Sequence, residues 1–193
     1  GAGGTDYAQL LTTIEAQDIA SSGWNYTSSS SFITLSFWVK SSVAQNFYFN
    51  FVTGDGTAQN YPFETGSLTA DNWTKVVKTI PGNSNIQFDN DIGNGLQLHM
   101  TPFWGTSYTD NGVSLNAWGA YDGNARVPNY TTTWYTTNDA TFELTGIQLE
   151  VGSQATAFEH RSFSEELALC QRYYFQPDVN STLPVSYTHL TLP

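Results

Sequence analysis

Two stretches of the sequence decide the fold: "FITLSFWVKSS", Phe32–Ser42, and "NFYFNFVTGDG", Asn46–Gly56. In the first stretch every second residue from Ile33 to Val39 is apolar, which gives a strand one apolar face and one mixed face. The second stretch repeats the alternation with phenylalanine and ends in a Gly-Asp-Gly turn. Because side chains alternate between the two faces of a strand, both stretches indicate strands that bury one face in a core.

The same alternation recurs along the chain and predicts further strands over residues 73–80, 96–100 and 142–149. Gly146 interrupts the last of these and indicates a bulge. Residues 5–20 carry Leu10, Ile14 and Ile19 at mixed spacing and are interpreted as an edge strand. Residues 106–139 are interpreted as mostly loops with short strands. No helices alternate with the strands, so the expected fold is all-β, an antiparallel jelly-roll β-sandwich of about eight to ten strands.

The charge of the chain excludes two classes of partner. Asp and Glu total 17 against 6 Lys and Arg, for a formal net charge of -11. Such a surface repels phosphate backbones and anionic lipid headgroups, so we expect neither nucleic-acid binding nor membrane binding. No apolar run approaches the roughly 20 residues that a membrane-spanning helix needs.

The segment "RSFSEELALCQRYY", Arg161–Tyr174, is predicted to form a short helix. Ser162 and Glu165 have the spacing of a capping box, and Ser164 is an alternative N-cap. A helix of about ten residues is marginal alone, so it is expected to dock on the sandwich, a neighbouring subunit or a following domain. Its apolar stripe supplies the predicted interface residues Leu167, Cys170, Tyr173 and Tyr174.

Cys170 is the only cysteine, so it cannot form an intrachain disulfide. We expect it to be a small buried apolar residue. The predicted organisation is a sandwich over residues 1–160, a connector helix over 161–176 and a tail over 177–193. The end of that tail, "PVSYTHLTLP", resembles the translated read-through of a transposase-type sequencing adapter, so we expect the native reading frame to be lost near Pro184.

The string "TGIQLEVGSQATAFEHRSFSEELALCQRYY", Thr145–Tyr174, resembles a segment that recurs in tail-fibre and other virion structural proteins of tailed bacteriophages. A looser likeness covers "LTTIEAQDIA", "ITLSFWVKSS" and "NDIGNGLQLHM" in the same order. In that family the sandwich is similar to carbohydrate-binding modules. The resemblance implies a virion protein that forms a homo-oligomer, commonly a trimer, contacts other virion proteins and uses the closing helix as a connector.

A glycan-binding site is expected in the Gly- and Asn-rich loops between Phe103 and Tyr135. Aromatic rings stack on the C–H faces of sugars, while Asn and Asp side chains bond to their hydroxyls. The alternative is that these rings plug the ends of the sandwich or form subunit contacts. Trp38 and Trp73 lie on regular strands and are interpreted as core or sheet-face residues. The predicted glycan-binding residues are Trp104, Tyr108, Trp118 and Tyr121.

Catalysis and metal binding are weaker hypotheses. Glycosidases use two carboxylates about 5–10 Å apart, and no spacing singles out a pair among Glu64, Glu143 and Glu150. We therefore predict no enzymatic activity and no cofactor. The oxygen-rich stretch with Asp89, Asp91 and Asn94 could hold calcium, but turn formation by these side chains is the favoured interpretation.

The sequence is compatible with three functions. The first is a virion structural module of a tail fibre or surface appendage, with a contact to host-surface glycans. The second is a carbohydrate-binding module of a secreted bacterial glycan-degrading enzyme. The third is a phage capsid decoration protein.

Overall fold

The computed structural model describes residues 1–171. The chain divides into a first unit, Gly1–Phe158, and a second unit that begins at Glu159. The sequence analysis placed the end of the sandwich at residue 160. None of the helices described is long and apolar enough to cross a membrane.

The first unit is built mainly of strands. The elements in chain order are β1 (Tyr7–Glu15), α1 (Ala16–Ala20), β2 (Phe32–Ser41), β3 (Tyr48–Thr53), β4 (Gln59–Glu64), β5 (Thr74–Pro81), β6 (Asn94–Trp104), β7 (Gly119–Ala120), α2 (Thr133–Thr136) and β8 (Phe142–Val151), with α3 (Phe163–Gln171) in the second unit.

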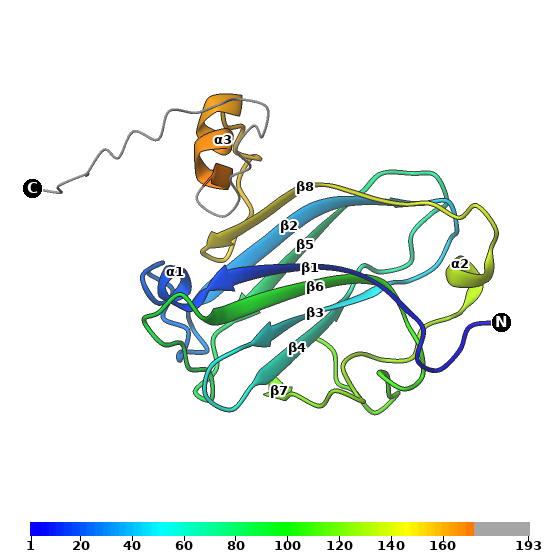
Figure 1. Ribbon diagram of the computed structural model, residues 1–193, viewed down its shortest axis with the longest axis horizontal. Coiled ribbons are helices and arrows are strands. Elements are labelled where there is room, and N and C mark those ends of the chain that lie inside the picture. Colours follow the sequence, from blue (N-terminus) through cyan, green and yellow to red (C-terminus); the bar gives the residue numbers. More distant parts are fainter. Residues whose placement is uncertain (172–193) are drawn as a thin grey trace, which may run out of the picture. The chain divides into compact units, whose positions relative to one another are not determined.

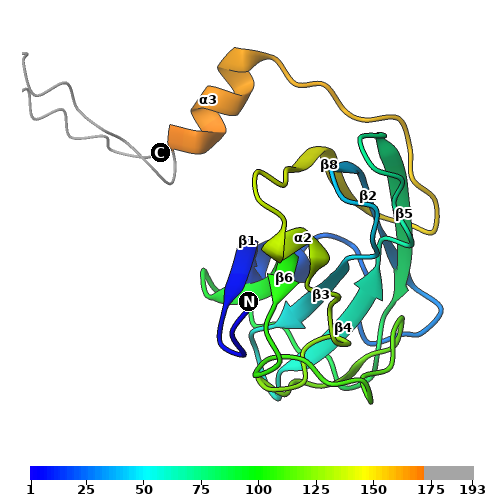
Figure 2. The same ribbon diagram turned by 90° about the vertical axis from the view of Figure 1, so that its right-hand side faces the viewer.

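The strands form two antiparallel sheets that face each other (Figures 1 and 2). The larger sheet has the order β1-β6-β3-β4-β7, and the smaller has the order β5-β2-β8. The chain crosses repeatedly between the sheets, as in a jelly roll. The predicted all-β sandwich followed by one short C-terminal helix is confirmed.

Aromatic rings fill the space between the sheets. Phe37 of the smaller sheet and Phe49 of the larger are both fully buried, with ring centroids 5.6 Å apart. The inward residues follow the alternation expected from the sequence, because successive side chains of a strand point to opposite faces. The buried inward residues of β2, β3 and β6 include Ile33, Leu35, Phe37, Val39, Phe49, Phe51, Leu96, Leu98 and Met100.

The bulge predicted at Gly146 is also present. The pairing of β2 with β8 shifts register between Ser36 and Trp38, which leaves Gly146 and Ile147 opposite Phe37. Gly146 has a φ of 60°, in the left-handed region that glycine adopts without strain.

The edge strand at the N-terminus is confirmed, but its predicted length is wrong. β1 ends at Glu15, and Ile19 lies in α1 instead. At this point the backbone N–H groups of Ala16 and Gln17 donate to the carbonyl oxygens of Gly93 and Asp91, at 3.0 and 2.9 Å. These bonds turn the chain into α1, so the strand cannot continue.

The second unit has the predicted capping box at the start of α3. The backbone N–H of Glu165 donates to Ser162 Oγ at 3.4 Å and the N–H of Ser162 donates to Glu165 Oε2 at 3.0 Å, so Ser162, and not Ser164, caps the helix. No residue of α3 is buried. The expectation that Cys170 is buried is therefore wrong. Its thiol is exposed, as are all the other side chains of α3. Tyr173, Tyr174 and the predicted tail lie outside the described residues.

The inter-sheet contact of Phe49 makes a stability prediction. Replacing Phe49 by Ala removes a fully buried ring that also contacts Phe63 and Phe142. We expect F49A to lower the free energy of unfolding by about 3–5 kcal/mol, measured by urea denaturation. F163A is the matched control, because Phe163 is 82% exposed and its loss should cost less than about 0.5 kcal/mol. Equal effects of the two substitutions would contradict this account of the core.

Candidate functional site: two aromatic surfaces of the sandwich

A covering segment, residues 105–140, lies along the β4 edge and over the outer face of the five-stranded sheet, and its last part packs Trp134 against Phe47 and Phe142 at the end of the sandwich. It first runs beside β4, where the N–H of Asn116 donates to the carbonyl of Pro62 at 2.8 Å. It then crosses the sheet, where the Tyr130 hydroxyl lies 2.6 Å from the carbonyl oxygen of Thr101. Figure 2 shows the segment on the side of this sheet that faces away from the smaller sheet. The chain itself therefore fills the face on which an open sugar-binding groove could have formed.

The residues beneath the covering segment are polar. Asn50 and His99 are paired across β3 and β6, and both are buried. The side-chain amide of Asn50 donates to Asn60 Oδ1 at 2.8 Å, and Asn60 in turn donates to the carbonyl of Arg126 at 2.7 Å. Because a buried polar group without a partner is costly, these bonds tie the covering segment to the sheet.

Three of the four predicted glycan-binding residues converge on one cation. The guanidinium carbon of Arg126 lies 4.5 Å from the ring centroid of Trp104, 5.0 Å from that of Tyr108 and 5.7 Å from that of Tyr121. The rings and the guanidinium attract one another as cation–π pairs. Trp104 is only 3% exposed, so it offers no free ring face and the expected stacking of a sugar on Trp104 is ruled out in this conformation. This Arg126 cluster instead fastens the covering segment to the end of β6.

The fourth predicted residue, Trp118, lies apart from that cluster. Its ring packs on Tyr61 with centroids 5.1 Å apart, and its Nε1 donates to the carbonyl of Pro81 at 2.7 Å. Trp118 thus joins the two sheets at one edge. This resembles the alternative from the sequence analysis, in which these rings close the ends of the sandwich. It also lines a hollow of about 390 Å³ with Asn60, Ser114 and Asp122.

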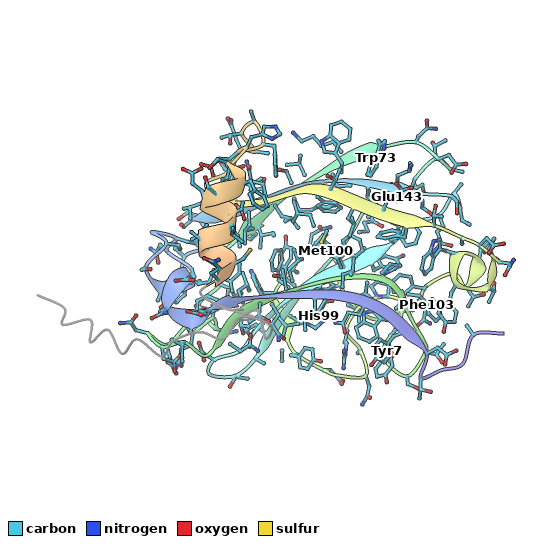
Figure 3. All side chains as sticks on the ribbon, turned by 45° about the horizontal axis from the view of Figure 1, so that its top comes forward. Tyr7, Trp73, His99, Met100, Phe103 and Glu143 are labelled. Atoms are coloured by element: carbon cyan, nitrogen blue, oxygen red, sulfur yellow. The ribbon has the colours of Figure 1, made fainter. Side chains whose placement is uncertain are left out.

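The most exposed tryptophans lie on the other sheet. The outer face of β5-β2-β8 carries side chains in rows that cross the three strands. Trp38 lies between Lys75 and Thr145 in one row, and Lys40 pairs with Glu143 in the next. Trp73 precedes β5 and joins the second row, since the Lys40 ammonium lies 5.1 Å from its ring centroid. Figure 3 shows Trp73 and Glu143 on this sheet.

We call Trp38, Trp73 and the polar residues between them the tryptophan platform. Both indoles are 42% exposed. Lys40 Nζ forms an ion pair with Glu143 Oε1 at 2.8 Å, which places a donor and an acceptor beside the Trp73 ring. Gly146 lies beside the indole of Trp38, and a Cβ added there would be in van der Waals contact with it, 3.4 Å from its Cδ1. Flat exposed rings with polar neighbours suit stacking on a sugar.

The sequence analysis interpreted Trp38 and Trp73 as core or sheet-face residues. Both are sheet-face residues, because each is 42% exposed. The platform itself was nevertheless missed as a candidate site. The signal was available, because Trp38 alternates with the apolar residues Phe37 and Val39 and so had to point away from the core.

The three candidate carboxylates are separated. Glu143 and Glu150 lie seven residues apart along β8, about 20 Å at the rise of a strand. Glu64 belongs to the other sheet and accepts a hydrogen bond from Asn46 Nδ2 at 2.6 Å. Hydrogen bonds from Thr156 and Gln148 lower the pKa of Glu150, which makes this carboxyl a poor proton donor. Glu143 and Glu150 are therefore too far apart to act as the two carboxylates of a glycosidase.

The possible calcium stretch forms turns. Asp91 Oδ1 accepts a hydrogen bond from the backbone N–H of Gly93 at 2.8 Å, and the N–H of Asp89 donates to Asp55 Oδ2 at 3.0 Å. Asn94 begins β6. Over residues 1–171, no group of three His, Cys, Asp or Glu side chains is placed to hold a metal ion. The turn interpretation is confirmed for Asp91.

Comparison with known proteins adds no relative to this picture: no family model, curated protein or solved structure matches the chain.

The buried His99 makes a pH prediction. Burial, with a smaller contribution from the Arg126 charge, lowers the pKa of His99 to about 4. The unfolded chain binds this proton near pH 6.5 while the folded chain does not, so stability is full above about pH 7 and falls towards pH 4. Between pH 7 and pH 5 we expect His99 to cost about 2 kcal/mol of unfolding free energy.

Urea denaturation at pH 7, 6 and 5 measures this loss. H99Q places a neutral amide at this position that cannot take up the proton, so its stability should fall about 2 kcal/mol less than that of the wild type over this range. Parallel curves for the two proteins would show that His99 is not held neutral beneath the covering segment.

Proposed function

We propose that this protein is a structural module of a tailed-bacteriophage virion, in a tail fibre or another surface appendage, that contacts host-surface glycans. It performs no chemistry, assembles with copies of itself and with other virion proteins, and uses the sandwich as its recognition domain. The observation that carries the proposal is the closing segment, Thr145–Tyr174, whose sequence resembles virion proteins.

The geometry of the closing segment supports a connector. β8 ends the sandwich at Val151, and a capped helix follows whose apolar side chains are open to solvent. Phe163 is 82% exposed, and Leu167 and Leu169 are each about half exposed. A helix that buries nothing of its own gains stability only when another surface covers it. We assign that role to the next part of the appendage, reached through Leu167 and Cys170.

The tryptophan platform is the surface we assign to glycans. It is exposed and flat, unlike the predicted set Trp104, Tyr108 and Tyr121, whose rings surround Arg126. Trp38 and Trp73 are diagonal neighbours on adjacent strands, a relation that spaces side chains about 7–8 Å apart and suits neighbouring sugar rings. Lys40 and Glu143 supply hydrogen bonds for the hydroxyls. The hollow at Trp118 is the second candidate, because it combines a ring with Asn60 and Asp122.

Glycan binding is tested with the whole chain on an array of bacterial surface polysaccharides. We expect the double variant W38A/W73A to lose binding by about tenfold or more, because both stacking rings are gone. Its melting temperature should stay close to that of the wild type, since both rings are partly exposed.

W118A separates the two candidate surfaces. Retained binding in W118A with loss in W38A/W73A supports the platform, and the reverse moves the site to the hollow. No binding by the wild type to any glycan would reduce the module to a scaffold.

The virion assignment has its own test in the complete open reading frame and its neighbours. We expect genes for portal, capsid or tail proteins beside it, and the protein among the polypeptides of purified particles. A hydrolase domain in the same reading frame would support the alternative of a carbohydrate-binding module. A copy number matching the capsid subunits would support a decoration protein.

A further inference from the structure

The outermost strand of the larger sheet has an open side. β1 pairs with β6 alone, and no other strand of residues 1–171 bonds to it. Figure 1 shows β1 at the border of its sheet. The backbone N–H and C=O groups on the far side of the run Leu10–Ile14 therefore have no strand partner. Such an edge is a template for pairing with another chain.

Proteins usually protect an edge of this kind with lysine, proline or a bulge in its middle. The sequence of β1, YAQLLTTIE, contains neither lysine nor proline. Its register shifts fall near its two ends, and the run Leu10–Ile14 pairs with β6 without interruption. Leu10 and Leu11, which point to opposite faces of the sheet, are 57% and 51% exposed. Both faces of the edge thus present apolar surface to solvent.

We propose that β1 pairs with β1 of a second copy of this chain, antiparallel and centred on Thr12. A two-fold axis perpendicular to the sheet keeps each face of the sheet continuous, so every residue opposes one on the same face. The pairing joins two five-stranded sheets into one. It goes beyond the proposed function and does not depend on glycan binding.

The strand is complementary to itself in this register. Leu10 lies opposite Ile14 of the partner copy, which gives an apolar pair on the inner face at both ends of the run. Thr12 lies opposite its own equivalent, and cross-strand threonine pairs stabilise sheets. Glu15, the only charged residue of β1, lies opposite Gln9 and so avoids a second carboxylate. Over residues 9–15 the proposed register therefore brings no two like charges opposite each other.

Cysteine cross-linking tests the pairing in the full chain with Cys170 replaced by Ser, because the native thiol is exposed. Thr12 and Thr13 are both exposed neighbours on β1, which makes T12C and T13C a matched pair. In the proposed register the two thiols of the T12C variant face each other within the range of a disulfide. In the T13C variant, each position 13 lies opposite residue 11 of the partner copy. The two thiols are therefore more than about 7 Å apart, beyond that range.

We expect T12C to form a covalent dimer under mild oxidation at a yield at least tenfold above that of T13C. Light scattering should give the wild type the mass of two chains at high concentration. Higher ionic strength should favour the dimer, because each copy carries a net charge of -11.

Lysine substitution gives the independent test. T12K should raise the dimer dissociation constant at least tenfold while its circular dichroism and melting temperature stay unchanged. V77K is the control, because Val77 is 46% exposed and lies on β5 of the smaller sheet, so its dimer should persist. A wild type that stays monomeric, a preference for cross-linking through position 13, or a mass of three chains without a T12C cross-link would each overturn the pairing.

Discussion

The contact between Phe37 and Phe49 is the constraint on which the rest of the molecule depends, because it joins the two sheets at the centre of the core. Neither sheet can bury its apolar face alone, and a two-layer arrangement is the simple solution. Rings contribute large buried areas for few residues, which suits a chain whose aromatic content is 15% and whose charged content is 12%. The alternation that places Phe37 inward necessarily places Trp38 outward. The tryptophan platform is thus a direct consequence of the register that builds the core.

The two outer faces of the sandwich have different chemistry because different lengths of chain are available to cover them. The five-stranded sheet lies under the long covering segment, whose Arg126 carbonyl accepts a hydrogen bond from the buried Asn60. The cation–π contacts of Arg126 hold that segment at the end of β6. The three-stranded sheet lies between short connections and keeps Trp38 and Trp73 in solvent. Recognition by exposed rings is therefore more favourable on the smaller sheet.

The sequence predicted what depends on local periodicity and missed what depends on distant partners. The strands over Phe32–Ser41 and Asn94–Trp104, and the bulge at Gly146, follow from alternation and from a glycine. The burial of Trp104 could not be predicted, because its ring is covered by Tyr7 and Arg126, which are far away in the chain. The end of β1 depends on hydrogen bonds to Gly93 and Asp91, which propensity does not encode. Likewise, the exposure of Cys170 depends on which surface covers a short helix, and local sequence does not encode that surface.

The open edge and the tryptophan platform lie on different sheets, so the proposed pairing of two copies leaves both platforms free. This separation matters for binding. A single platform of two rings gives a modest affinity for a sugar, whereas two platforms held at a fixed distance turn the second contact into an intramolecular event. A polysaccharide repeats the same unit along its length, so a paired module can engage it twice without any new contact. In the proposed dimer, the pairing of β1 would therefore strengthen the proposed glycan contact, because both platforms would bind the same polysaccharide chain.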